Sequence, residues 1–171
     1  MVHSGTKWNE GNYLTSLQEI DVSGWKIMFI GEFTHTIDDK KRLAMPKKIV
    51  KELGRKVVMT RGLDGALFVY PMKTWDTIAK RLQDLSFTSA DSRGFNRFML
   101  SGASEVEVDS AGRVLIPEYL KEFAGLKTKV VIAGVSDRVE LWDEQRWTAY
   151  KATIERDADK LAEKLAQVGI L

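Results

Sequence analysis

Hydrophobic and polar residues alternate in several short stretches of the chain, a pattern that predicts half-buried β-strands. In the stretch 104–108, Val106 and Val108 alternate with glutamates, and the turn-forming residues 109–112 follow directly. An apolar stretch resumes at 113–116. The same reasoning predicts two further strand pairs, at 57–60 with 66–70 and at 130–134 with 139–142. The chain therefore predicts short strands joined by tight turns.

After each set of strands, the apolar residues recur about every 3.6 positions, which indicates helices over 75–85 and 147–168. A third helix is predicted to start near Ser89. Two short helices are expected over 46–54 and 117–125, because proline fits the first turn of a helix and glycine fits its end. The fold class predicted by this mixture is α+β.

The two halves of the chain repeat one another. Three residues recur 71 positions later with the same mutual spacing: Asp38 and Asp109, Arg42 and Arg113, Pro46 and Pro117. After a one-residue insertion the offset becomes 72, and Trp75 aligns with Trp147. An ordered series of matches indicates the duplication of one module. Because a small module of this kind leaves strand edges unpaired, we expect the two copies to pair with each other.

The repeat divides the chain into four predicted parts. Residues 1–27 are an N-terminal extension that we expect to be poorly ordered. Residues 28–88 hold the first copy and its helix, 89–102 a linker helix, and 103–171 the second copy with the C-terminal helix.

Charge is unevenly distributed, although the net charge is only +2. Residues 38–61 hold nine basic and three acidic side chains, whereas residues 139–168 hold five basic and seven acidic ones. A concentrated basic segment attracts a polyanion, and it is the electrostatic pattern expected of a nucleic-acid-binding protein. The alternative is a solvated surface without a partner.

Other classes of function find little support in the sequence. With no cysteine and two histidines, the chain lacks the residues of a thiol nucleophile or a common zinc site, and we expect neither a metal nor a cofactor. The motifs of phosphate loops, metalloproteases and serine hydrolases are absent from the sequence, so we expect no enzyme, catalytic residue or small-molecule substrate. We also expect no membrane partner and a cytoplasmic location, because the sequence contains neither a long apolar segment nor a secretory signal.

The repeated Asp-x-x-x-Arg motif places an arginine on a tight turn between strands. Arginine stays charged and donates two parallel hydrogen bonds to guanine or to phosphate. Asp38 and Asp109 would hold the turn or brace the guanidinium, and Gly112 would permit a positive φ. The alternative is that each Asp–Arg pair is an ion pair that only stabilises its turn.

These features resemble the MraZ family of bacterial regulators. The resemblance rests on the doubled Asp-x-x-x-Arg-x-x-x-Pro motif, the short helix after each proline, the helices that begin with aromatic residues and the segment 98–113. It covers residues 28 to about 166, which is most of the chain. It implies tandem AbrB-like swapped-hairpin β-barrel modules with flanking helices and pseudo-twofold symmetry. It also implies a nucleoid-associated, ring-shaped homo-oligomer. Such a ring would bind double-stranded promoter DNA at direct repeats upstream of the division and cell-wall gene cluster.

The resemblance also identifies the DNA-binding residues. The motif arginines of the family contact DNA, which implies Arg42 and Arg113 here. Basic neighbours of the first motif would contact phosphates: Lys40, Lys41, Lys47 and Lys48. The motif's bracing residues would be Asp38, Asp109, Pro46, Pro117 and Gly112.

The two motifs are not equivalent in sequence. Lys41 stands where the family usually has glycine, and residues 105–129 hold five acidic and four basic side chains, which repel phosphate. We therefore expect the first copy to be the main DNA-contacting copy and the second to complete the fold or the ring. A different hypothesis is a protein-interaction module that sequesters a partner, as some antitoxins do. A functional role for the acidic C-terminal helix would favour that hypothesis.

Overall fold

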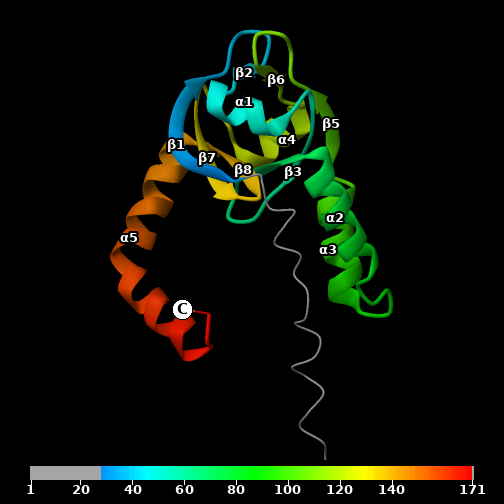
Figure 1. The fold of residues 1–171 in the computed structure, drawn as a ribbon, viewed down its shortest axis with the longest axis vertical. Coiled ribbons are helices and arrows are strands. Elements are labelled where there is room, and N and C mark those ends of the chain that lie inside the picture. Colours follow the sequence, from blue (N-terminus) through cyan, green and yellow to red (C-terminus); the bar gives the residue numbers. More distant parts are fainter. Residues whose placement is uncertain (1–27, 171) are drawn as a thin grey trace, which may run out of the picture.

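The computed structural model describes residues 28–170, and the disorder expected for residues 1–27 lies outside this range. The described chain forms an α+β fold with a six-stranded sheet, a separate two-stranded ribbon and five helices (Figure 1). The strands are β1 (Phe29–Thr36), β2 (Arg42–Ala44), β3 (Lys56–Arg61), β4 (Leu67–Pro71), β5 (Ser104–Glu107), β6 (Arg113–Leu115), β7 (Lys129–Ser136) and β8 (Arg138–Asp143). The helices are α1 (Lys47–Leu53), α2 (Met72–Gln83), α3 (Ala90–Leu100), α4 (Glu118–Ala124) and α5 (Glu144–Gln167).

The two copies exchange strands. The sheet order is β1-β7-β8-β4-β3-β5, so β1 of the first copy pairs with β7 of the second, and β5 of the second pairs with β3 of the first. The ribbon joins β2 of the first copy to β6 of the second. All of these pairs are antiparallel. The expectation that the copies pair with each other is therefore confirmed.

The strand order also shows the symmetry of the duplication. Replacing each strand by its counterpart in the other copy reverses the order of the sheet, so a pseudo-twofold axis passes between β4 and β8. The sheet has β1 and β5 as its two edges, and the closed barrel implied by the resemblance is not confirmed.

A hydrophobic core lies between the sheet and the elements above it in Figure 1, which are α1, α4 and the ribbon. Leu43 and Val114 contribute to it from the two ribbon strands, and Ile49 and Leu120 from the two short helices. These residues are at most 2% exposed. Each of the two pairs relates residues 71 positions apart, so the symmetry of the sequence continues into the core.

A second apolar cluster covers another part of the sheet. It includes Tyr70 and Trp142, with Trp75 of α2 and Trp147 of α5 packed beside them. The paired α2 and α3 and the single α5 extend from the body of the molecule as two separate arms (Figure 1). The helix predicted near Ser89 begins at Ala90, with the Ser89 hydroxyl accepting a hydrogen bond from the Ser92 N–H. None of the helices in the described range is long and apolar enough to cross a membrane.

Relative to the short helices, Pro46 and Pro117 lie one position earlier than the sequence predicted. Pro46 and Pro117 are the residues before α1 and α4, not members of their first turns. Both have φ −56° and ψ 138°, which is extended backbone. Each proline thus lies between a ribbon strand and a short helix, two positions after the strand ends and one before the helix begins.

The pairing of β1 with β7 can be tested at Gly134, which lies opposite Gly31. A Cβ at Gly134 would lie 2.5 Å from the backbone nitrogen of Ile30, so Gly134→Ala forces β1 away from β7. We expect the free energy of unfolding, measured by urea denaturation, to fall by about 2 kcal/mol or more. The matched control is Gly94→Ala in α3, where a Cβ meets nothing within 4 Å. That variant is expected to gain up to about 1 kcal/mol, and similar losses in both would contradict this role of Gly134.

Candidate nucleic-acid interface

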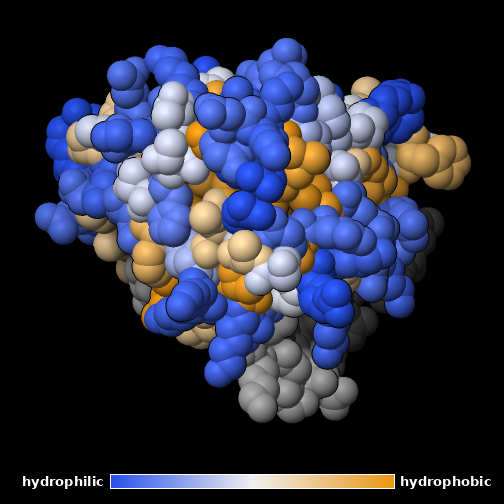
Figure 2. All heavy atoms as spheres, turned by 90° about the horizontal axis from the view of Figure 1, so that it is seen from above, coloured by the Kyte–Doolittle hydropathy of each residue, from blue (hydrophilic) through white to orange (hydrophobic). Residues whose placement is uncertain are grey.

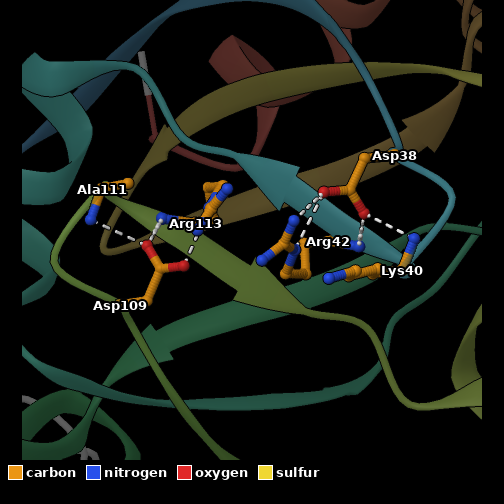
Figure 3. Close-up of polar contacts among 6 residues, drawn as sticks. All are labelled: Asp38, Lys40, Arg42, Asp109, Ala111 and Arg113. Atoms are coloured by element: carbon orange, nitrogen blue, oxygen red, sulfur yellow. Dashed lines mark hydrogen bonds and ion pairs between the residues drawn. The ribbon is translucent and has the colours of Figure 1, made fainter.

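The first Asp–Arg turn, residues 38–42, is built by the carboxylate of Asp38. Its Oδ1 accepts the backbone N–H groups of Lys40 and Arg42, each at 2.9 Å. Its Oδ2 accepts the Arg42 Nε at 2.8 Å and lies 2.7 Å from Nη2 (Figure 3). One short side chain therefore holds both the backbone of the turn and one edge of the guanidinium.

The second Asp–Arg turn, residues 109–113, repeats this geometry. Asp109 Oδ1 accepts the N–H groups of Ala111 and Arg113 at 2.9 Å, and Oδ2 accepts the Arg113 Nε at 2.8 Å (Figure 3). The backbone bonds that close the two turns also correspond: Asp38 N–H to Arg42 O and Asp109 N–H to Arg113 O, both at 2.9 Å. The two turns thus share the same pattern of hydrogen bonds.

The bonds to arginine lower the pKa of both carboxyl groups. For Asp38 the largest cause is the side-chain hydrogen bond from Arg42, and for Asp109 it is the backbone N–H of Arg113. Both groups stay ionised at neutral pH, so each guanidinium lies beside a full negative charge. The two arginines remain accessible, with 30% of the Arg42 side chain and 35% of the Arg113 side chain exposed.

Lys41 adopts the conformation that glycine has in the second turn. Its φ is +61°, and that of Gly112 is +74°. Its carbonyl accepts the Ile116 N–H at 3.1 Å, just as the Gly112 carbonyl accepts the Met45 N–H at 2.9 Å. The lysine in the family's glycine position therefore leaves the turn intact, at the cost of a left-handed backbone that suits glycine better.

The ribbon places the two turns at one end of the molecule (Figure 1). In its register Arg42 lies opposite Leu115, and Ala44 lies opposite Arg113. The two arginines, 71 residues apart in sequence, thus come from neighbouring strands. The remaining basic residues predicted for the site lie in or just after the first turn, and all are exposed: Lys40, Lys41, Lys47 and Lys48.

The structure adds two residues that the sequence had not singled out. Glu118, at the start of α4, forms an ion pair with Lys41 across the two copies and has its pKa lowered, chiefly by that bond. Leu115 is 55% exposed beside Arg42. The sequence gives no signal for Leu115, because residues 114–116 are all apolar, and only the structure shows Val114 and Ile116 buried with Leu115 exposed between them. The contact of Glu118 depends on the pairing of the copies and has no local signal.

Residues 28–170 contain no group of three or more acidic, histidine or cysteine side chains arranged to hold a metal ion. A shallow cavity of about 380 Å³ lies beside the second turn, lined by residues that include Gly54, Arg55 and Asp109. Its entrance is broad and its lining is mainly apolar, so it offers few polar groups to orient a small molecule. The half-buried but accessible arginines of the ribbon are therefore the more promising interaction site.

The left-handed position can be tested by comparing Lys41→Gly with Lys41→Ala. Both variants lose the ion pair with Glu118, so the difference between their stabilities measures the cost of a left-handed backbone at residue 41. We expect Lys41→Gly to be more stable than Lys41→Ala by about 1 kcal/mol in urea denaturation. Gly112→Ala should lose a similar amount, since its φ is positive and its Cβ would lie 3.2 Å from Val50 Cγ2. Equal stability of the two Lys41 variants would contradict this account.

The lowered pKa values of Asp38 and Asp109 predict that the fold loses stability in acid. A carboxyl group whose pKa is lower in the folded chain stabilises the fold above its ordinary value, here 3.8, and loses this effect as the pH falls through the folded pKa. The double variant Asp38→Asn and Asp109→Asn lacks both groups. We expect its thermal midpoint to decline less than that of the wild type below about pH 4. Parallel curves from pH 7 to pH 2.5 would show that these groups do not govern acid stability.

Comparison with known proteins agrees with the duplication. The model of the family described as "MraZ protein, putative antitoxin-like" matches residues 28–98 and again residues 99–168. A protein of Acetivibrio thermocellus named "Transcriptional regulator MraZ" is 46% identical over 143 residues, 84% of this chain and 100% of that protein. Proteins of the same name from Moorella thermoacetica and Heliobacterium modesticaldum are 49% identical over 143 residues (84% of this chain and 100% of that protein) and 48% identical over 138 residues (81% and 96%). These names describe regulators, not enzymes, and the matches together show that the chain belongs to the MraZ family.

Proposed function

We propose that the chain is a transcriptional regulator that binds double-stranded DNA in a sequence-specific manner through the β2–β6 ribbon. The observation that carries this proposal is the placement of Arg42 and Arg113. Each is held by its own aspartate, and the ribbon brings both to one exposed end of the molecule. The names of the relatives support a role in transcription.

The geometry of the arginines suits recognition of bases. In the first turn the ion pair with Asp38 involves Nε and Nη2, which is one edge of the guanidinium. A guanidinium carries N–H groups on all three nitrogens, so a second edge remains to donate to guanine O6 and N7. Because the aspartate fixes the side chain in advance, little conformational entropy is lost on binding.

The lysines of the first copy supply affinity without sequence preference. Lys40 lies in the first turn, and Lys47 and Lys48 begin α1, which starts three positions after the last residue of the ribbon strand. As exposed ammonium groups they would contact phosphates and release counterions, which makes binding depend on salt. Lys41 already has Glu118 as a partner, and its contribution would require that exposed ion pair to open.

The proposal assigns the main DNA contacts to the first copy. The second turn is followed by Glu118 and Glu122 of α4, and β5, which precedes it, carries Glu105 and Glu107. These carboxylates make the sequence around the second turn more acidic than the sequence around the first, although Glu118 itself pairs with Lys41 of the first turn. The second copy would then serve chiefly to complete the fold and the oligomer.

The family resemblance extends the proposal to the assembly and its target. The strand exchange between the copies is what an AbrB-like swapped hairpin requires. One ribbon offers few base contacts, so a ring-shaped homo-oligomer on direct repeats would gain the missing affinity by avidity. Repeats upstream of the division and cell-wall gene cluster are the proposed target, and the nucleoid within the cytoplasm is the proposed location.

The test is a fluorescence-anisotropy titration at two salt concentrations, on duplex DNA from upstream of the chain's own gene and on scrambled DNA. We expect the wild type to prefer the upstream duplex and to bind more weakly at higher salt. Arg42→Ala should weaken specific binding by about 5- to 150-fold, as expected when a hydrogen-bonded arginine no longer reaches its base. Arg113→Ala should have a smaller effect, because the segment that contains it, residues 105–129, holds more acidic than basic side chains.

The control is Arg156→Ala in α5, which removes one exposed positive charge far along the chain from the ribbon. It should change binding little. Equal losses for Arg42→Ala and Arg113→Ala would contradict the ranking of the copies. If wild type and Arg42→Ala bind both duplexes equally well, the Asp–Arg pairs only stabilise their turns, and a protein partner becomes the better hypothesis.

A further inference from the structure

The ribbon presents four side chains on its outer face. Leu43 and Val114, the central residues of β2 and β6, are 0% exposed and point into the core. Because side chains alternate along a strand, their neighbours point outward. These neighbours are Arg42, Ala44, Arg113 and Leu115.

The outer face is not symmetric, although the backbone is. Leu43 and Val114 pair at the centre of the ribbon, so the pseudo-twofold symmetry relates Arg42 to Arg113 and Ala44 to Leu115. Both copies thus supply an arginine, but only the second supplies a large apolar side chain. Leu115 is 55% exposed and lies directly opposite Arg42. Seen from the ribbon side, the molecule is mostly hydrophilic, with hydrophobic residues reaching the surface near the centre of the view (Figure 2).

A single exposed leucine is common on protein surfaces and by itself indicates nothing. The position of Leu115 is informative because residues directly opposite each other have Cβ atoms about 5 Å apart. A surface that lies against the outer face of the ribbon at Arg42 therefore also lies against Leu115. On DNA the apolar group available beside a guanine edge is the C5-methyl group of thymine, in the major groove.

The dimensions of the ribbon agree with such a contact. The major groove is about 12 Å wide and admits two antiparallel strands, which lie about 4.8 Å apart. Alternate residues of a strand are about 6.7 Å apart, close to two base-pair steps of about 3.4 Å. Arg113 and Leu115 on β6 thus have a spacing that matches bases two steps apart.

We propose that Leu115 is a specificity-determining residue that contacts the C5-methyl group of a thymine next to the base bound by Arg42. The inference rests on the proposed DNA binding of the ribbon. It gives the second copy a direct role in recognition that does not depend on Arg113. Ala44, the counterpart in the first copy, is too short to make the same contact, so the apolar contact comes from one side of the ribbon only.

The experiment compares one upstream duplex synthesised with thymine and again with uracil throughout, which removes the methyl groups and keeps the base pairing. The wild type should bind the uracil duplex about three- to five-fold more weakly for each methyl group that Leu115 contacts. Leu115→Ala should bind both duplexes equally, with an affinity near that of the wild type for uracil DNA. Leu115→Met, which keeps an apolar side chain of similar length, should restore the preference for thymine.

The matched control is Leu63→Ala. Leu63 is 52% exposed, almost as much as Leu115, but lies at the end of the β3–β4 hairpin and should keep the full preference. Circular dichroism of each variant verifies that it is folded, which is expected because both leucines are exposed. A preference for thymine that survives in Leu115→Ala overturns the inference, because the methyl groups are then recognised elsewhere.

Two further outcomes separate this inference from the proposed function. If the wild type binds specifically and loses affinity in Arg42→Ala but does not distinguish thymine from uracil, Leu115 makes no methyl contact and DNA binding by the ribbon stands. If the wild type binds neither duplex specifically, both proposals fail.

Discussion

Antiparallel pairing between the two copies is the constraint on which the rest of the structure depends. Each copy contributes one hairpin of its own, β3–β4 or β7–β8, and relies on the other copy for the remaining strands. A copy alone would expose the backbone edges of its strands and the apolar faces of its short helix and ribbon strand. With both present, these faces meet in one core. Duplication within the chain makes this pairing intramolecular, so it does not depend on protein concentration.

The same pairing creates the candidate site. An Asp–Arg turn is a local device, because the aspartate, the backbone N–H groups and the arginine it binds lie within five consecutive residues. A single turn offers one guanidinium. The ribbon places a second one on the neighbouring strand and seats both on a rigid core through Leu43 and Val114. An ion pair that stabilises a turn and an arginine held ready for a ligand are therefore compatible, since the aspartate uses one edge of the guanidinium.

Divergence between the copies has affected side chains more than backbone. The turns share their hydrogen bonds, and Lys41 adopts the left-handed conformation of Gly112 despite its side chain. What differs is chemistry: lysines lie close to the first turn in the sequence and glutamates close to the second, and leucine replaces alanine on the outer face of the ribbon. A pseudo-symmetric scaffold that presents different groups from its two halves suits a duplex site that is not itself symmetric.

The sequence by itself determined the local elements. Alternation at 104–108, the prolines before α1 and α4, and the 3.6-residue period of α5 predict their structures, because each depends on neighbours a few residues away. The repeat also predicted that the copies pair, since a single module of this kind leaves strand edges unpaired. Only the tertiary structure decided which strands exchange, that Lys41 meets Glu118, and that Leu115 faces solvent beside Arg42. These facts depend on the register between strands about 70 residues apart, and that register is set by how the two halves share a core.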